Sequence, residues 1–282
     1  MKKRVLRDVL VNLLAIAVLI WILFPIYNML VTSFKTYQDV WKTTYLPPTP
    51  TIEPYIVVLT QQYWRMNYFW IWLWNSLRIS FMVMFLAVGV GSLTGYSLST
   101  RCSLGRKIKS LLETLALFTY IFPSSILSIP IYILLRNYGL LDSDIGLSLA
   151  LSVLVIPFNA WMAAEYFDKI PKEINEAAAI DGAPHMTIFL RILLPLAIPA
   201  IIALSVYSFM YSWNSYLYPL LIINTEIKFP LPLGMSSFLA SDDSPWNIFM
   251  ATSILYALPA VIVYYAFKKY LIAGLFRGAV KA

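Results

Sequence analysis

Six runs of mainly apolar residues dominate the sequence, and each is long enough to cross a lipid bilayer as a helix. A transmembrane helix needs about 20 such residues. Hydrophobic residues make up 60% of the 282 positions and charged residues only 12%, whereas soluble domains carry about 25% charged residues. The sequence therefore predicts an all-α membrane protein with six transmembrane helices, at residues 9–31, 75–97, 111–135, 145–167, 196–222 and 248–267.

Basic residues are distributed unevenly between the two sides that these six spans would define. The N-terminus, the C-terminus and the loops after the second and fourth spans hold 15 of the 21 Lys and Arg residues. Cytoplasmic segments of membrane proteins are enriched in these residues. We therefore expect a multi-pass protein of the cell membrane with both termini in the cytoplasm and the longest loop, residues 32–74, outside. The net charge of +7 then reflects orientation and contact with anionic lipid, and no nucleic-acid partner is expected.

Reactive side chains are scarce. Cys102 is the one cysteine and His185 the one histidine, so neither an internal disulfide nor a zinc site of the usual composition is expected. The sequence contains no G-x-x-x-x-G-K-[ST] motif and no charge near the middle of a predicted span. Without that motif the chain is expected to have no ATPase site of its own. The lack of charge near the middle of the spans argues against an ion-coupled transporter or an intramembrane enzyme. We expect no catalytic residue, no metal and no cofactor, and an energy source outside the membrane for any uphill transport.

The loop after the fourth span, residues 168–191, has the pattern of a short capped helix. Pro171 suits a first helical turn, and the alanines at 177–179 favour helix. Gly182 is placed to end the helix in the left-handed region, and Pro184 then begins a second helical stretch. A two-turn helix is not stable by itself, so it either docks on a partner or serves only as a capped connector.

A signature in this loop resembles that of a known family. The pattern combines Glu176-Ala177-Ala178, Gly182 and Ile192-x-Leu194-Pro195, and it is similar to the EAA motif of binding-protein-dependent ABC importer permeases. Further short motifs resemble the carbohydrate-uptake branch of that family, of the maltose and multiple-sugar type. They are Asn75-Ser76-Leu77, Gly95-Tyr96-Ser97, Phe122-Pro123, Trp213-Asn214 and the tail from Leu271 to Lys281.

The resemblance implies the MetI-like transmembrane fold of type I ABC importers. It divides the chain into an N-terminal helix and outer loop (1–74), a five-helix core (75–267) that contains the coupling loop, and a cytoplasmic tail (268–282). The implied function is ATP-driven uptake of a di- or oligosaccharide, with another solute such as glycerol phosphate as the alternative. The implied partners are a second permease subunit, two cytoplasmic ATPase subunits and an extracellular or periplasmic substrate-binding protein.

The resemblance also implies roles for the residues of the motif. Glu176 would pair with a basic residue in a cleft of the ATPase subunit, and Ala177 and Ala178 would allow close seating there. Gly182 would permit the turn that sets the angle to the fifth helix. Pro195 completes the coupling segment.

Hydroxyl, amide and aromatic side chains form neighbouring stripes along the predicted fifth helix. Such groups suit a sugar, whose rim needs hydrogen bonds and whose C–H face packs on aromatic rings. The alternative is that the serines serve helix packing and the tyrosines lie at the membrane interface. The candidate path residues are Tyr207, Ser208, Tyr211, Ser212, Asn214 and Ser215, and Ser205 and Tyr218 extend the two stripes.

Four other features have simpler interpretations. Gly91-x-x-x-Gly95 predicts a face of close helix packing, and Asn75 and Arg78 are candidate gate or packing residues. His185 is expected to be a solvated loop histidine. The aromatic cluster at 63–74 suits the membrane interface, with a partner-docking surface as the alternative.

Overall fold

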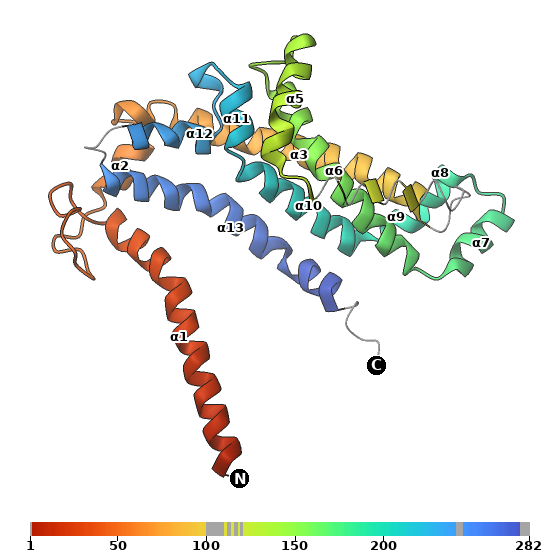
Figure 1. The fold of residues 1–282 in the computed structure, drawn as a ribbon, viewed down its shortest axis with the longest axis horizontal. Coiled ribbons are helices and arrows are strands. Elements are labelled where there is room, and N and C mark those ends of the chain that lie inside the picture. Colours follow the sequence, from red (N-terminus) through yellow and green to blue (C-terminus); the bar gives the residue numbers. More distant parts are fainter. Residues whose placement is uncertain are drawn as a thin grey trace. The chain divides into compact units, whose positions relative to one another are not determined.

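The computed structural model describes residues 2–99, 110–111, 114–115, 118, 121–240 and 245–276, and every regular element among them is helical (Figure 1). This agrees with the predicted all-α class. The chain divides into two compact units. One unit comprises Met1–Trp70 with Met235–Leu258, and the other comprises Ile71–Gly234 with Pro259–Ala282.

The first unit contains one long apolar helix and several short ones. They are α1 (Lys2–Ser33), α2 (Glu53–Leu59), η1 (Trp64–Met66), η4 (Ser236–Ala240) and the first half of α13 (Trp246–Phe276). None of the most apolar stretch of α1 is buried inside the protein, as expected for a helix surrounded by lipid. Phe238 belongs to the core of this unit, since it is fully buried and packs on the rings of Tyr63 and Phe249.

The second unit contains the longer helices of the predicted core and the short helices between them. They are α3 (Phe69–Leu98), α5 (Ser124–Asn137), α6 (Asp144–Asp168), α7 (Lys172–Ile180), α8 (His185–Ile188), the π-helical turn η2 (Phe189–Leu193), α9 (Leu194–Leu196), α10 (Ile198–Trp213), α11 (Leu217–Ile222), η3 (Glu226–Lys228), α12 (Leu231–Met235) and the second half of α13. The loop between α6 and α8 therefore forms a helix, as the sequence predicted.

The number of spanning helices differs from the predicted six within the described residues. Four helices there are long and apolar enough to cross a membrane, and a fifth span arises if the bent pair His185–Leu196 and Ile198–Trp213 is counted as one. The predicted span at 111–135 lies partly outside the described residues, and its described end forms α5. Treating 196–222 as one continuous helix was wrong, since α10 ends at Trp213 and α11 begins at Leu217.

A proline lies near the start of each helix that follows an interruption in this segment. Pro199 has no N–H to donate to the carbonyl of Pro195, and the chain bends by 83° between α9 and α10. Pro219 likewise cannot donate to the carbonyl of Ser215. At the end of α10, the Asn214 side-chain amide donates to the Met210 carbonyl at 2.9 Å.

The packing of α3 on α6 depends on the two glycines predicted to form a close-packing face. A Cβ atom at Gly91 would lie 2.6 Å from Asn159 Cβ, and one at Gly95 would lie 2.6 Å from Ala163 Cβ and 2.7 Å from the Ala160 carbonyl oxygen. Real Cβ atoms do not approach so closely, so the prediction is confirmed. The two helices are thus in close backbone contact at these positions.

Candidate functional site

One face of α7 is exposed and combines acidic, small and apolar side chains. Glu173, Glu176, Ala177 and Ile180 are all exposed, and their i, i+3, i+4, i+7 spacing places them on one side of the helix. Ile180 has 86% of its surface exposed. We call these four residues the α7 face.

The opposite side of α7 holds the helix on its own chain. Ala178 is only 8% exposed and belongs to an apolar cluster with Tyr96, Phe167 and Phe189. The two alanines of the motif therefore have different surroundings, because Ala177 faces outward and Ala178 faces inward. Ala178 seats α7 on its own chain in this structure, which differs from the expected seating of both alanines against a partner.

Ile180 is a member of this face that the motif in the sequence does not include. It follows Glu176 by four residues, and this spacing could have identified it as part of the same face.

Gly182 ends α7 in the conformation that the sequence predicted. Its φ is +77°, in the left-handed region, and its N–H donates to the Ala179 carbonyl at 3.0 Å. Pro184 is the residue immediately before α8, as expected. Pro195 is exposed in α9, just before the 83° bend that leads to α10. A short helical path thus connects the α7 face to α10.

His185 lies at the start of α8 and is exposed, as a solvated loop histidine would be. Its Nδ1 atom also lies 3.3 Å from the Tyr96 hydroxyl, on a cavity of about 480 Å³ that Met186 and Phe189 help to line. Within the described ranges, no group of three or more His, Cys, Asp or Glu side chains could hold a metal ion.

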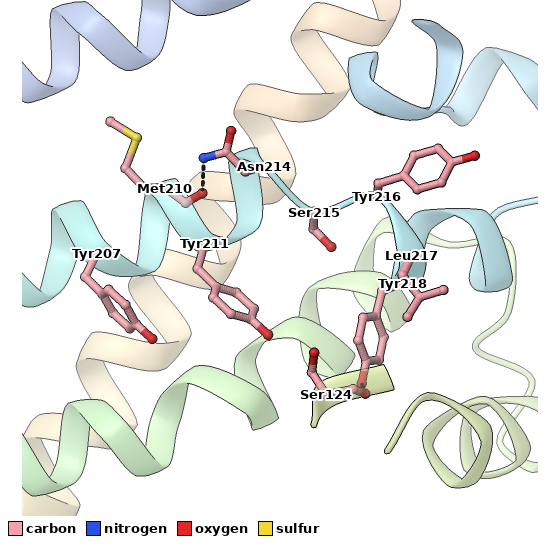
Figure 2. Close-up of a pocket in the computed structure, with 9 residues that line it drawn as sticks. All are labelled: Ser124, Tyr207, Met210, Tyr211, Asn214, Ser215, Tyr216, Leu217 and Tyr218. Carbon is pink, nitrogen blue, oxygen red and sulfur yellow. Dashed lines mark hydrogen bonds between the residues drawn. The ribbon is translucent and has the colours of Figure 1, made fainter. Parts of the chain in front are cut away.

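A second cavity lies where α10 gives way to α11, and its volume is about 460 Å³ (Figure 2). This size is within the range of small-molecule sites. Four of the candidate path residues line it, namely Tyr207, Tyr211, Asn214 and Ser215. The others are Ser124, Met210, Tyr216, Leu217 and Tyr218. We call this the tyrosine cavity.

The tyrosine rings are held in place by neighbouring helices. Tyr207 packs on Phe158 of α6 with ring centroids 4.5 Å apart, and Tyr218 donates its hydroxyl hydrogen to the Ser124 carbonyl at 2.7 Å. Figure 2 shows the Tyr211 hydroxyl pointing toward Ser124 at the start of α5. The wall thus presents hydroxyl and amide groups between aromatic faces, which can bind a neutral polar ligand.

The structure places two candidate path residues elsewhere. Ser208 is fully buried and accepts a hydrogen bond from the Asn159 amide at 2.8 Å, which ties α10 to α6. Ser212 is 6% exposed, 3.4 Å from the Ser80 hydroxyl of α3. Both serines serve helix packing here, the alternative that the sequence left open. Ser205 donates to the Ile201 carbonyl of its own helix.

Asn75 and Arg78 act as packing residues. The buried Asn75 amide donates to the carbonyls of Ile227 and Phe229 at 2.9 and 3.1 Å. Arg78 donates to the Asn75 side-chain oxygen at 3.1 Å and forms an ion pair with Asp144. These bonds join the start of α3 to η3 and to the start of α6.

Asp142 closes the same end of the second unit. Its carboxylate accepts hydrogen bonds from the backbone N–H groups of Asn224 and Thr225 at 3.0 and 2.9 Å, from the Thr225 hydroxyl at 2.7 Å and from the Lys228 ammonium at 2.9 Å. Burial raises the pKa of Asp142, but these hydrogen bonds outweigh it and hold the pKa well below its usual range. The carboxylate fastens the loop before α6 to the segment after α11.

The chain thus combines several apolar helices long enough to span a membrane with the exposed α7 face and a polar, aromatic cavity. Residues 87–277 match the family model described as binding-protein-dependent transport system inner membrane component. The chain belongs to this family.

Individual relatives agree over nearly the full length. The inner membrane ABC transporter permease protein YcjP of Escherichia coli is 34% identical over 93% of this chain and 92% of its own. The trehalose/maltose transport system permease protein MalG of Thermococcus litoralis is 29% identical over 100% and 99%. A chain of a bacterial ABC transporter for the polysaccharide alginate has the same fold, with a TM-score of 0.76, 22% identity, and coverage of 96% of this chain and 98% of that one.

Proposed function

We propose that this chain is a permease subunit of an ATP-driven importer whose cargo is a di- or oligosaccharide. The α7 face carries this proposal, because an exposed helix joined to α10 through the bend is what an external motor requires. Relatives named for arabinooligosaccharide, diacetylchitobiose and trehalose/maltose transport support the choice of cargo.

The α7 face provides the contact through which an ATPase subunit would act. Glu176 supplies a negative charge for a basic residue in the cleft of the partner, and Ile180 supplies an apolar anchor. Movement of α7 is transmitted to α10 because α7, α8, η2 and α9 follow each other with only short connections. Bistable packing at such a joint converts a small displacement into a change of helix angle.

The tyrosine cavity favours a sugar over a phosphate-bearing solute. None of its nine lining residues is Lys or Arg, whereas recognition of a phosphate relies on cationic groups. Arg78, the one candidate for that role, is engaged by Asn75 and Asp144. Glycerol phosphate is therefore the weaker alternative.

The remaining assignments, of partners and of membrane orientation, belong to the same proposal. A second permease subunit completes the pathway, two ATPase subunits bind on the cytoplasmic side, and a substrate-binding protein delivers sugar from outside. Both termini lie in the cytoplasm. The core at 75–267 carries the pathway, and the tail at 268–282, which lies partly outside the described residues, extends toward the ATPase subunits.

Reconstitution of the complete complex in proteoliposomes tests the proposal. Uptake of an oligosaccharide accepted by the binding protein should require ATP, and Glu176→Lys should reduce it at least tenfold while the protein still inserts. Glu226→Lys is the matched control, because it reverses an exposed acid on η3 in the same unit and should leave uptake unchanged. Uptake that continues without the ATPase subunits would refute the proposal.

A further inference from the structure

The first unit contains a cavity that the proposed function does not use. It has a volume of about 490 Å³ and lies between the last turns of α1, from Phe24 to Thr32, and the loop segment 40–45. All its walls belong to one unit. We call it the Lys35 cavity, after the residue that gives it its charge.

Lys35 is a buried cation without a carboxylate partner among the described residues. Its residue surface is 3% exposed, and its ammonium group donates to the Lys42 carbonyl at 2.8 Å. An ammonium group has three donors, so two remain for a ligand in the cavity. The Asn247 side chain donates to the Lys35 carbonyl at 3.1 Å and fixes the backbone at this point.

The other charges near the cavity cancel. The Lys42 ammonium lies 2.7 Å from the Asp39 carboxylate, and hydrogen bonds from Lys42 and Thr49 lower the pKa of Asp39 to about 2. Asp39 therefore remains ionised at neutral pH and neutralises Lys42. One uncompensated positive charge is left on Lys35, and burying such a charge is costly unless an anion accompanies it.

A second, independent observation also indicates a ligand. Thr44 lines the cavity, and its hydroxyl oxygen is buried without a hydrogen-bond partner in the described chain. The Thr44 N–H donates to the Lys42 carbonyl, the same oxygen that accepts from Lys35. The Lys35 ammonium group and the Thr44 N–H thus share the Lys42 carbonyl oxygen as their acceptor.

The surroundings of the cavity are those of a membrane interface. Asn28 and Thr32 are polar residues in the last turns of α1, where its apolar, exposed stretch ends. Tyr27, Trp41 and Tyr45 stand around the cavity with 41%, 63% and 80% of their surfaces exposed. Tyr and Trp side chains with this arrangement are typical of the headgroup level of a bilayer.

We propose that the Lys35 cavity binds the phosphate group of a membrane phospholipid, with the Lys35 ammonium and the Thr44 hydroxyl as donors and the acyl chains along the exposed surface of α1. The inference does not depend on the transported cargo. A phosphodiester is a compact anion whose oxygens accept from several donors at once. An anionic lipid is favoured over a zwitterionic one because the site carries a net positive charge.

Binding of dioleoylphosphatidylglycerol to the purified complex in detergent, followed by native mass spectrometry and by the midpoint of thermal unfolding, tests this proposal. Lys35→Met keeps an apolar stem but removes the cation, and should weaken lipid binding about tenfold or more. Thr44→Val removes only the hydroxyl, for which the protein has no partner, and should weaken binding several-fold without loss of folding. Lys169→Met, an exposed lysine of the other unit, is the matched control.

Two further ligands distinguish the source of the phosphate. Dioleoylglycerol has the same chains without phosphate, and inorganic phosphate has no chains, so neither should reproduce the shift in the midpoint. Equal protection by either ligand would overturn the proposal. Wild-type lipid affinity in both variants would also overturn it, and Thr44→Val decides the matter if Lys35→Met fails to fold.

Discussion

The two ends of α6 are stabilised in different ways. At its start, Asp142, Asp144 and Asn75 bind the adjoining segments through hydrogen bonds and an ion pair. At its end, about 37 Å away for 25 residues, Ala178 packs α7 into an apolar cluster of the same chain. The first end satisfies its polar groups internally, whereas the second leaves an acidic and apolar face open.

This difference bears on the proposed docking of an ATPase subunit at α7. Docking a partner on polar groups that are already hydrogen-bonded within the chain adds little stability to the complex. Covering an exposed isoleucine stabilises the complex, because its apolar surface is removed from water. We infer that the Asp142 end acts as a fixed point and the α7 end as the input of the subunit, with α3 and α6 as the rigid connection between them.

The largest effect is expected from breaking this rigid connection. Gly95→Ala would place a Cβ within 3.0 Å of the backbone at both Ala160 and Ala164, so α3 and α6 must separate. We expect a loss of about 3 kcal/mol in the free energy of unfolding, at the upper end of overpacking effects. Denaturant titration of the purified protein in detergent measures this loss.

Gly89→Ala provides the control on the same helix. No atom lies within 4 Å of a Cβ at Gly89, and alanine favours helix over glycine by about 0.5–1 kcal/mol. We therefore expect a small gain in stability. Equal destabilisation by both substitutions would show that the α3–α6 contact is not the rigid connection described above.

A smaller effect is expected from releasing the fixed point. Asp142→Asn keeps the shape of the side chain, and asparagine tolerates the positive φ of 53° at this position. Its NH₂ group, however, would face N–H, hydroxyl and ammonium groups that donate to the carboxylate in the wild-type protein. We expect a loss of about 2 kcal/mol in the free energy of unfolding, as for hydrogen bonds to a charged group. The same denaturant titration at pH 7 measures it.

The effect of Asp142→Asn should also depend on pH. Because the folded-state pKa of Asp142 is depressed, its contribution is complete above the unfolded-state pKa of about 3.9 and is lost as the pH falls toward the folded-state value. The stability difference between the two proteins should thus be constant from pH 6 to 8 and shrink below about pH 4. A difference that stays constant down to pH 3 would contradict the assigned role of the carboxylate.

The sequence was sufficient for features that depend on local chemistry. Runs of apolar residues predicted the long helices, Gly182 and Pro184 predicted the boundary between α7 and α8, and Gly91 and Gly95 predicted a tight helix contact. Each of these follows from backbone conformation or residue volume at the position itself. Such properties do not change with the surrounding fold.

Features that depend on which helix lies opposite could not be predicted. Tyr207 and Ser208 are adjacent in the chain, and both carry a hydroxyl group. Ser208 accepts a hydrogen bond from Asn159 of α6 and is part of the helix packing, whereas Tyr207 lines a cavity. The same holds for Ala177 and Ala178, of which only one meets the apolar cluster. The break after Trp213 was missed because the hydropathy of 196–222 is continuous across Pro219.

The smallest effect on stability is expected at the α7 face itself. Ala178 and Ile180 are about 200° apart around the helix, so Ile180 points away from the contact that holds α7. Ile180→Ser should change the free energy of unfolding by less than about 0.5 kcal/mol, as for exposed positions. The same substitution should weaken binding of the ATPase subunit about tenfold to a hundredfold, because a buried isoleucine contributes about 1.5–3 kcal/mol.

Ile174→Ser on the same helix separates docking from folding. Ile174 precedes Ala178 by one turn and has 37% of its surface exposed, so its loss should reduce stability by about 1 kcal/mol. Titration of each purified variant with the ATPase subunit, together with denaturant unfolding, should give opposite profiles, with Ile180→Ser losing affinity and Ile174→Ser losing stability. If Ile180→Ser instead lowers stability and leaves affinity unchanged, α7 is only a connector, and the contrast between the two ends of α6 has no bearing on energy input.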